Sequence, residues 1–171
     1  CVKNGRKKVL DLCTGSGILA ISLAKEGASV GASDISSKAL DVAKENASIH
    51  QVTIDFREGD LFCVWEDEVF DLIVSNPPYI DAEGMKLLDN RVKKEPQLAL
   101  YGGEDGLDYY RKIIAQARTY LKNTGILAVE IAYNQGHLVS GLFEEYGFVN
   151  IVVLKDQQGL DRVVLGSHLA V

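Results

Sequence analysis

Short apolar runs alternate with segments of helical periodicity along most of this 171-residue chain, and this alternation restricts the possible folds most. It predicts an α/β fold with a doubly wound, mostly parallel sheet that carries helices on both faces. We expect parallel strands at residues 8–13, 29–34, 53–58, 70–75 and 126–132, and a C-terminal antiparallel pair at 148–155 and 162–166. The expected sheet therefore has seven strands.

Local boundary signals support the helices that this pattern places between the strands. Helices are expected at residues 18–26, 37–49, 107–121 and 135–145. Ser36 is a good N-cap for the second of them, and Gly27 is a plausible stop for the first. Residues 80–106 show no comparable pattern apart from a short helix near 83–88. Long loops in compact domains are usually functional, so we assign this stretch to the substrate side.

Composition excludes several classes of function. No apolar run approaches the roughly 18–20 residues that cross a membrane, and the net charge of −6 does not favour binding to long nucleic acid. The cysteines and histidines are scattered, without the spacing of a metal site or a disulfide framework. We therefore expect a cytoplasmic protein without a metal. The cysteines are Cys1, Cys13 and Cys63, and the histidines are His50, His137 and His168.

A glycine-rich turn follows the first expected strand. The segment from Asp11 through Leu12, Cys13, Thr14, Gly15 and Ser16 to Gly17 contains two glycines that allow a sharp turn and close approach to a ligand. Asp34 ends the second strand, where its carboxylate can accept both hydroxyls of a ribose. The pattern predicts a nucleoside-containing cofactor.

This turn alone leaves the type of cofactor open. Gly15 to Ala20 also fits the G-x-G-x-x-A dinucleotide pattern, so an NAD-dependent oxidoreductase is a competing interpretation. Against it, no Tyr-x-x-x-Lys pair or other hydride-transfer arrangement is visible. Asp60, at the end of the third strand, could accept from an adenine amino group while Leu61 packs on the ring, although a simple turn explains Asp60 equally well.

The sequence Asn76-Pro77-Pro78-Tyr79 separates these hypotheses. Two prolines fix the backbone directly after a strand, so the Asn76 side-chain oxygen and the Pro77 carbonyl can accept both hydrogens of one –NH2 group. Tyr79 can lie against a planar substrate. Such a grip orients a poorly nucleophilic amide or amine nitrogen without a strong base.

At these residues the chain resembles class I methyltransferases with a Rossmann-like sheet, and specifically the release-factor glutamine N5-methyltransferases (the HemK/PrmC family). The discriminating stretch runs from Glu95-Pro96 through Ala99-Leu100 and Gly102-Gly103 to Asp105-Gly106-Leu107. It is similar to the family pattern E-P-x-x-A-L-x-G-G-x-D-G-L. Glu130-Ile131 with Gln135, and Asp156 through Gly159 to Asp161-Arg162, are similar to later segments of the family.

The resemblance implies S-adenosylmethionine as cofactor, S-adenosylhomocysteine as product and the Gly-Gly-Gln loop of peptide chain release factors as substrate. It also implies one catalytic domain over residues 1–171 and a helical substrate-docking module upstream, which this chain lacks. Asn76, Pro77 and Tyr79 become the expected catalytic residues, and Pro78 joins them in binding the substrate. The expected cofactor-binding residues are Asp11, Cys13, Thr14, Gly15, Ser16, Gly17, Asp34, Ile35, Asp60, Leu61 and Asn76.

The sequence allows more than one interpretation of Cys13, of Glu95 and of the methyl acceptor. Cys13 stands where glycine is commoner in the family, so its side chain must be tolerated near the cofactor. Glu95 could be a catalytic or substrate-orienting carboxylate, or it could brace the long loop through backbone hydrogen bonds, and bracing is favoured because this N-methylation needs no strong base. A methyltransferase acting on exocyclic amines of nucleic acid bases shares Asn-Pro-Pro-Tyr, but the acidic charge and the 95–107 pattern disfavour it.

Overall fold

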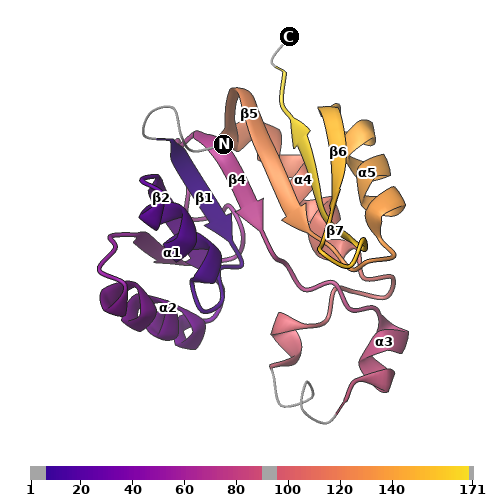
Figure 1. Ribbon diagram of the computed structural model, residues 1–171, viewed down its shortest axis with the longest axis horizontal. Helices are drawn as coiled ribbons and strands as arrows, with labels where there is room; N and C mark the ends of the chain where they lie inside the picture. Colours follow the sequence, from indigo (N-terminus) through magenta and orange to yellow (C-terminus); the bar gives the residue numbers. More distant parts are fainter. Residues whose placement is uncertain (1–6, 90–95, 170–171) are drawn as a thin grey trace.

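The computed structural model describes residues 7–89 and 96–169 and contains one seven-stranded sheet in the order β3-β2-β1-β4-β5-β7-β6 (Figure 1). β1 to β5 are parallel, while β7 runs antiparallel to both β5 and β6. The predicted doubly wound sheet with an antiparallel C-terminal pair is confirmed. The strands are β1 (Lys8–Leu12), β2 (Ser29–Asp34), β3 (Asp55–Glu58), β4 (Phe70–Ser75), β5 (Leu121–Glu130), β6 (Val149–Lys155) and β7 (Asp161–Ser167).

Helices cover opposite faces of the two halves of this sheet. α1 (Ile18–Lys25) lies beside α2 (Ser37–Ile49) and packs on Val9, Val30 and Ala32. α4 (Asp108–Tyr120) and α5 (Gly136–Glu145) pack on the other face (Figure 1). The remaining elements, α3 (Ala82–Leu87) and the short 3-10 helix η2 (Gln97–Ala99), lie beyond the carboxyl ends of the strands.

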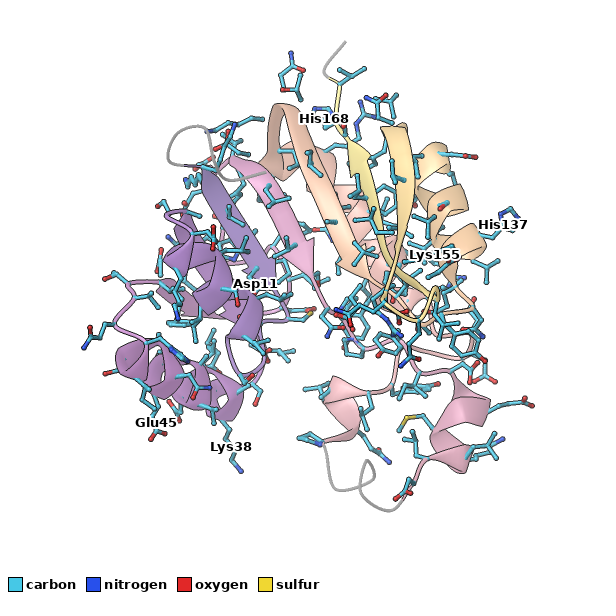
Figure 2. All side chains as sticks on the ribbon, viewed as in Figure 1. Asp11, Lys38, Glu45, His137, Lys155 and His168 are labelled. Atoms are coloured by element: carbon cyan, nitrogen blue, oxygen red, sulfur yellow. The ribbon has the colours of Figure 1, made fainter. Side chains whose placement is uncertain are left out.

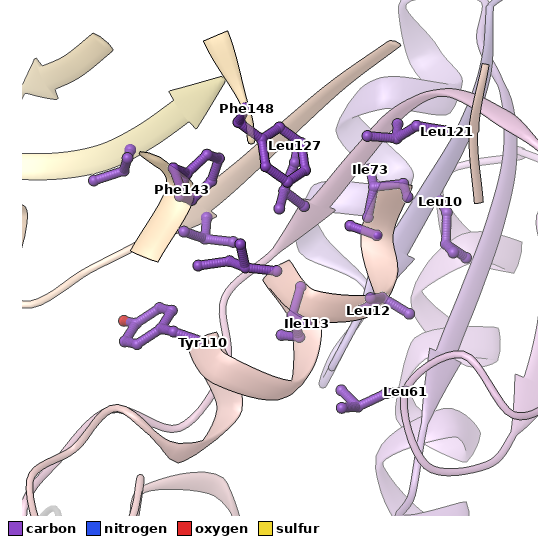
Figure 3. Packing of buried hydrophobic residues seen from close by; sticks show 14 of the residues in the cluster. Leu10, Leu12, Leu61, Ile73, Tyr110, Ile113, Leu121, Leu127, Phe143 and Phe148 are labelled. Atoms are coloured by element: carbon purple, nitrogen blue, oxygen red, sulfur yellow. The ribbon is translucent and has the colours of Figure 1, made fainter. Parts of the chain in front are cut away.

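The larger core cluster joins strands to helices that are distant in sequence. Leu10 and Ile73 from adjacent strands meet Ile113 of α4, and Leu127 of β5 lies near Phe143 of α5 (Figure 3). All five side chains are completely buried. Burying one such side chain contributes roughly 1.5–3 kcal/mol, so this cluster fixes α4 and α5 against the sheet.

Helix ends follow the predicted signals. The Ser36 side chain accepts from the backbone N–H of Ala39, as an N-cap does, and Gly27 follows α1 with a φ of 91°. The short helix expected near 83–88 is α3, whose N-cap Asp81 accepts from the N–H of Gly84 at 2.6 Å. Most other boundaries lie within a residue or two of those predicted.

The start of β5 was predicted wrongly. β5 begins at Leu121, directly after α4, rather than at residue 126. Leu121 pairs with Phe70 and Ile126 with Leu72, so the polar residues 122–125 form an irregularity inside the strand. Thr124 there has a φ of 65°. The polar sequence is typical of a turn, but pairing with β4 keeps it in the sheet.

The sheet order places a topological switch point at β1. From β1 the chain proceeds outward through β2 and β3, and then returns to place β4 on the other side of β1. Ligands of doubly wound folds bind beyond the carboxyl ends of the strands at such a point. In the part of the chain that the structure describes, no helix is both long and apolar enough to cross a membrane.

Candidate active site

A cavity of about 550 Å³ opens beyond the carboxyl ends of β1, β2, β4 and β5, within the size range of small-molecule sites. Its walls come from the predicted turn, from residues at or just beyond the carboxyl ends of β1 to β5, and from α1, α2, η2 and α4. The lining residues are Cys13, Thr14, Gly15, Ser16, Ile18, Leu19, Asp34, Ile35, Ser36, Ala39, Val42, Gly59, Asp60, Leu61, Asn76, Pro78, Pro96, Leu98, Ala99, Tyr109 and Glu130.

Asp11 braces the glycine turn from behind the cavity wall. Its Oδ2 accepts from the Thr14 hydroxyl at 2.6 Å and from the backbone N–H of Ala20 at 3.1 Å, which ties the turn to α1 (Figure 2). Its Oδ1 is buried and has no hydrogen-bond partner among the described residues. Burial raises the pKa of Asp11 to about 7, against the effect of these hydrogen bonds. Asp11 therefore positions the turn.

Asp34 joins the turn to the end of β2. Its Oδ2 accepts from the N–H of Gly15 and its Oδ1 from the N–H of Ser36, both at 2.9 Å. Each oxygen keeps further capacity to accept a hydrogen bond from a ligand. The Asp34 carbonyl also accepts from Gly59, so the acidic end of β2 and the end of β3 form one rigid wall.

The turn accommodates the side chain of Cys13 at the position where glycine is commoner in the family. Its backbone has a φ of 56°, which a side chain adopts at some cost in free energy, and this conformation ends β1 at Leu12 rather than at residue 13 as predicted. Burial, reinforced by the nearby Asp34 carboxylate, raises the pKa of the thiol to about 12. The Cys13 thiol therefore stays protonated at neutral pH and is a poor nucleophile.

The Asn76–Tyr79 loop directly follows β4 and forms part of the cavity wall. Asn76 is exposed and lines the cavity, while Pro77 and Pro78 are buried. The Asn76 side chain makes no hydrogen bond with any described residue and is thus available to a ligand. Tyr79 is half-buried, and its backbone carbonyl accepts from the side chain of Gln135 at 3.1 Å.

The segment that resembles the family pattern packs directly against this loop. The Ile80 N–H donates to the Leu100 carbonyl, and the Gly102 N–H donates back to the Ile80 carbonyl, both at 2.9 Å. A Cβ at Gly106, whose φ is 73°, would lie 2.5 Å from the Tyr79 carbonyl oxygen. Glycine there allows the two backbones to meet, which gives the pattern a physical reason.

Gln135 is a buried brace behind the loop. Its Nε2 donates to the carbonyls of Tyr79 and Gly106 at 3.1 and 3.3 Å. Its Oε1 accepts from the N–H of Ala132 at 3.0 Å and lies 3.4 Å from the Tyr110 hydroxyl. One side chain therefore connects the Asn76–Tyr79 loop, the segment before α4 and the turn after β5.

Gln135→Met should destabilise the fold, because methionine leaves two buried carbonyls without donors. We expect a loss of about 2–4 kcal/mol in the free energy of unfolding, measured by urea denaturation. Gln116→Met, at an exposed position of α4, is the matched control and should change stability by less than about 0.5 kcal/mol. Equal stability of the two variants would show that Gln135 does not brace the loop.

The structure brings most of the predicted site residues to one cavity. Asp11, Gly17, Pro77 and Tyr79 do not line it but lie in the elements that form its wall. The sequence did not identify Tyr109 and Leu98 as cavity residues, because no sequence pattern marks either of them. It also assigned no site role to Glu130, although this residue ends a parallel strand as Asp34 does. Glu95 and Cys1 lie outside the described residues.

Comparison with known proteins gives the family. Residues 1–104 match the family model described as the methyltransferase small domain. The chain belongs to this family. The glycine turn and the Asn76–Tyr79 loop both fall within the matched part of this methyltransferase small domain, and the fold matches the Rossmann-like class I methyltransferases predicted from the sequence.

A release factor glutamine methyltransferase from Clostridium acetobutylicum is 43% identical to this methyltransferase domain over 169 residues. The match covers 95% of this chain and 59% of the relative, so the chain spans about three fifths of that protein's length.

Two solved structures show the same fold at low identity. A methyltransferase from Pyrococcus furiosus has a TM-score of 0.77 and 17% identity, covering 97% of this chain and 77% of its own. The T. thermophilus 16S rRNA N2 G1207 methyltransferase, in complex with AdoMet and guanosine, has a TM-score of 0.65 and 19% identity. That match covers 94% of this chain and 37% of the other.

The cavity suits the cofactor that this family implies. Carboxylates of Asp34 and Asp60 stand beside the apolar side chains of Ile35 and Leu61, a combination that matches ribose hydroxyls and a planar base. Among residues 7–89 and 96–169, no three His, Cys, Asp or Glu side chains could hold a metal ion, and His137 and His168 lie apart from each other (Figure 2).

Proposed function

We propose that this chain transfers a methyl group from S-adenosylmethionine to the side-chain amide nitrogen of a glutamine in a protein. The proposed substrate is the Gly-Gly-Gln loop of peptide chain release factors. The observation that carries this proposal is the Asn76–Tyr79 loop, which two prolines and the hydrogen bond from Gln135 hold at the wall of the cavity. The 43% identity to a release factor glutamine methyltransferase supports the choice of substrate.

In this proposal the two ends of the cavity have different tasks. The turn and Asp34 hold the cofactor, which supplies a methyl group on a positively charged sulfur. Asn76 Oδ1 and the Pro77 carbonyl accept the two hydrogens of the glutamine amide and orient its nitrogen. Tyr79 lies beside the amide plane. Because the two prolines and Gln135 fix the loop in advance, little reorganisation is needed in the transition state.

The main alternative is a methyltransferase for an exocyclic amine of a nucleic acid base, since such an amine offers the same two hydrogens. The net charge of −6 disfavours this substrate, because affinity for nucleic acid depends largely on basic contacts to phosphate. A structural neighbour bound to guanosine shares only the fold at 19% identity. The glycine turn would also suit an NAD-dependent oxidoreductase, but the methyltransferase family match and the Asn76–Tyr79 loop disfavour that activity.

Incubating the chain with methyl-labelled S-adenosylmethionine and a recombinant bacterial release factor tests the proposal. Mass spectrometry should place one methyl group on the glutamine of the Gly-Gly-Gln loop. A release factor with glutamate at that position is the control and should stay unlabelled. Label on RNA or DNA oligonucleotides instead of the protein would favour the alternative.

Binding of an intact release factor draws, in this proposal, on a helical module upstream of the catalytic domain, as the resemblance implies. A glutamine side chain offers much less surface than the roughly 1,200–2,000 Å² of a standard interface. Truncating the longer Clostridium relative to its matched residues tests this, because the loss should appear chiefly as a higher KM. A cytoplasmic location, where release factors act, completes the proposal.

A further inference from the structure

Glu130 stands beside the Asn76–Tyr79 loop on the neighbouring strand. It is the last residue of β5 and lines the same cavity as Asn76. Ser75 pairs with Val129 in the parallel register, so Asn76 and Glu130 continue the two strands side by side. Adjacent strands lie about 5 Å apart, and residues in register project to the same face. The Glu130 carboxylate therefore faces the part of the cavity that Asn76 lines.

Its place in the sheet distinguishes Glu130 from the other carboxylates in the cavity. Among the described residues, the lining carboxylates are Asp34, Asp60 and Glu130. Asp34 ends β2, which β1 separates from β4, and Asp60 follows β3, one strand farther away. Of these three, only Glu130 belongs to a strand that pairs with β4, so it stands on the strand next to Asn76.

The surroundings of Glu130 leave its carboxylate available. No described residue donates a hydrogen bond to it, although the Tyr110 hydroxyl of α4 donates to the Glu130 backbone carbonyl at 2.8 Å. Arg162 of β7 is the nearby cation, and its guanidinium is paired with Asp156 at 2.9 Å. Burial raises the pKa of Glu130, while the charge of Arg162 acts in the opposite direction. The carboxylate also acts electrostatically on the Tyr110 hydroxyl of α4, whose pKa burial raises, and Tyr79 acts on both Tyr110 and Arg162.

We propose that Glu130 contacts the acceptor amide and takes up the proton that its nitrogen loses on methylation. This inference rests on the proposed function. Asn76 and Pro77 offer only amide oxygens, which are very weak bases, so they can orient the nitrogen but cannot keep its proton. A carboxylate is a weak base but a much stronger one than an amide oxygen, so a half-buried carboxylate next to them can take the proton, and no strong base is needed.

The step balances in atoms and charge. The nitrogen lone pair forms a bond to the methyl carbon, and the bond from that carbon to the sulfonium sulfur breaks with its electron pair remaining on sulfur. One N–H proton passes to an oxygen of the Glu130 carboxylate. The positive sulfur and the negative carboxylate thus become neutral together, and the proton leaves Glu130 for water after the product departs.

Glu130→Gln keeps the size of the side chain and removes the proton acceptor. We expect kcat for release-factor methylation to fall about 10²-fold, with the Kd for S-adenosylmethionine from calorimetry unchanged. In the wild type, kcat should fall as the pH drops through the pKa of Glu130, because the protonated carboxyl cannot accept. This fall in kcat at acidic pH, the acidic limb of the pH profile, should be absent in the variant. Glu58→Gln, at an exposed position ending β3 outside the cavity, is the matched control.

A second measurement needs no variant. The 13C resonance of the Glu130 carboxyl should shift when a release factor binds in the presence of S-adenosylhomocysteine, whereas that of Glu58 should not. An unshifted resonance, a Glu130→Gln kcat within a few-fold of wild type, or an acidic limb retained in the variant would overturn the role of Glu130. A wild-type chain that transfers no methyl group to the release factor would overturn the proposed function as well, which distinguishes the two failures.

Discussion

Asn76→Ala should lower kcat for methyl transfer by about 10²–10³-fold, the size of effect seen when one transition-state hydrogen bond is removed. The Asn76 side chain is exposed and makes no hydrogen bond with any described residue. Its loss should therefore affect the acceptor nitrogen far more than the fold. Single-turnover kinetics with a release factor measure the rate, and calorimetry with S-adenosylmethionine should show an affinity within a few-fold of wild type.

Gln157→Ala is the matched control for this experiment, because it removes an exposed amide from the turn between β6 and β7, away from the cavity. It should leave both the rate and the affinity unchanged. A turnover of the Asn76 variant within a few-fold of wild type would show that the side-chain oxygen does not orient the acceptor.

Asp34→Ala should weaken S-adenosylmethionine binding by about 10²–10⁴-fold. Two charge-assisted hydrogen bonds to ribose are lost, each worth about 1.5–3 kcal/mol. The variant also frees the N–H groups of Gly15 and Ser36, so the turn itself should loosen. Calorimetry measures the affinity, and thermal unfolding without ligand separates the two contributions.

Asp41→Ala, an exposed carboxylate on α2, controls for the change in net charge and should bind the cofactor normally. The wild-type chain should not bind NADH under the same conditions. Tight NADH binding without S-adenosylmethionine binding would contradict the cofactor assignment, and an unchanged affinity in Asp34→Ala would exclude the carboxylate as a ribose ligand.

Local signals were enough to predict the order of the helices and strands, because the signal for each element comes from residues that are close together in the sequence. Ser36 caps α2 with its own side chain, and the apolar run at Phe70–Ser75 forms a strand in the middle of the sheet. The β5 irregularity could not be predicted in this way. It exists because Leu121 pairs with Phe70, a contact between residues far apart in the chain.

The same distinction applies to the cavity. The turn and Asn76–Tyr79 are contiguous motifs whose residue types report their chemistry, so they could be found in the sequence. Tyr109 reaches the cavity only because α4 packs on the sheet, and Gln135 acts through carbonyls that lie 56 and 29 residues away along the chain. Such roles depend on tertiary packing, which no single-sequence pattern encodes.

Two separate segments of the chain form the two parts of the cavity wall, which affects how the substrate of such a protein could be changed. The part that we propose holds the cofactor comes mainly from residues 13–61, and the part that we propose holds the acceptor nitrogen comes from residues 76–130. β4 pairs with β1 up to Ser75, and the loop that follows is held by Gln135 and by the segment before α4. Exchanging residues 76–107 as a unit should therefore change which nitrogen is methylated and leave the residues that we propose hold the nucleoside unchanged. Both natural evolution and protein design could use such an exchange.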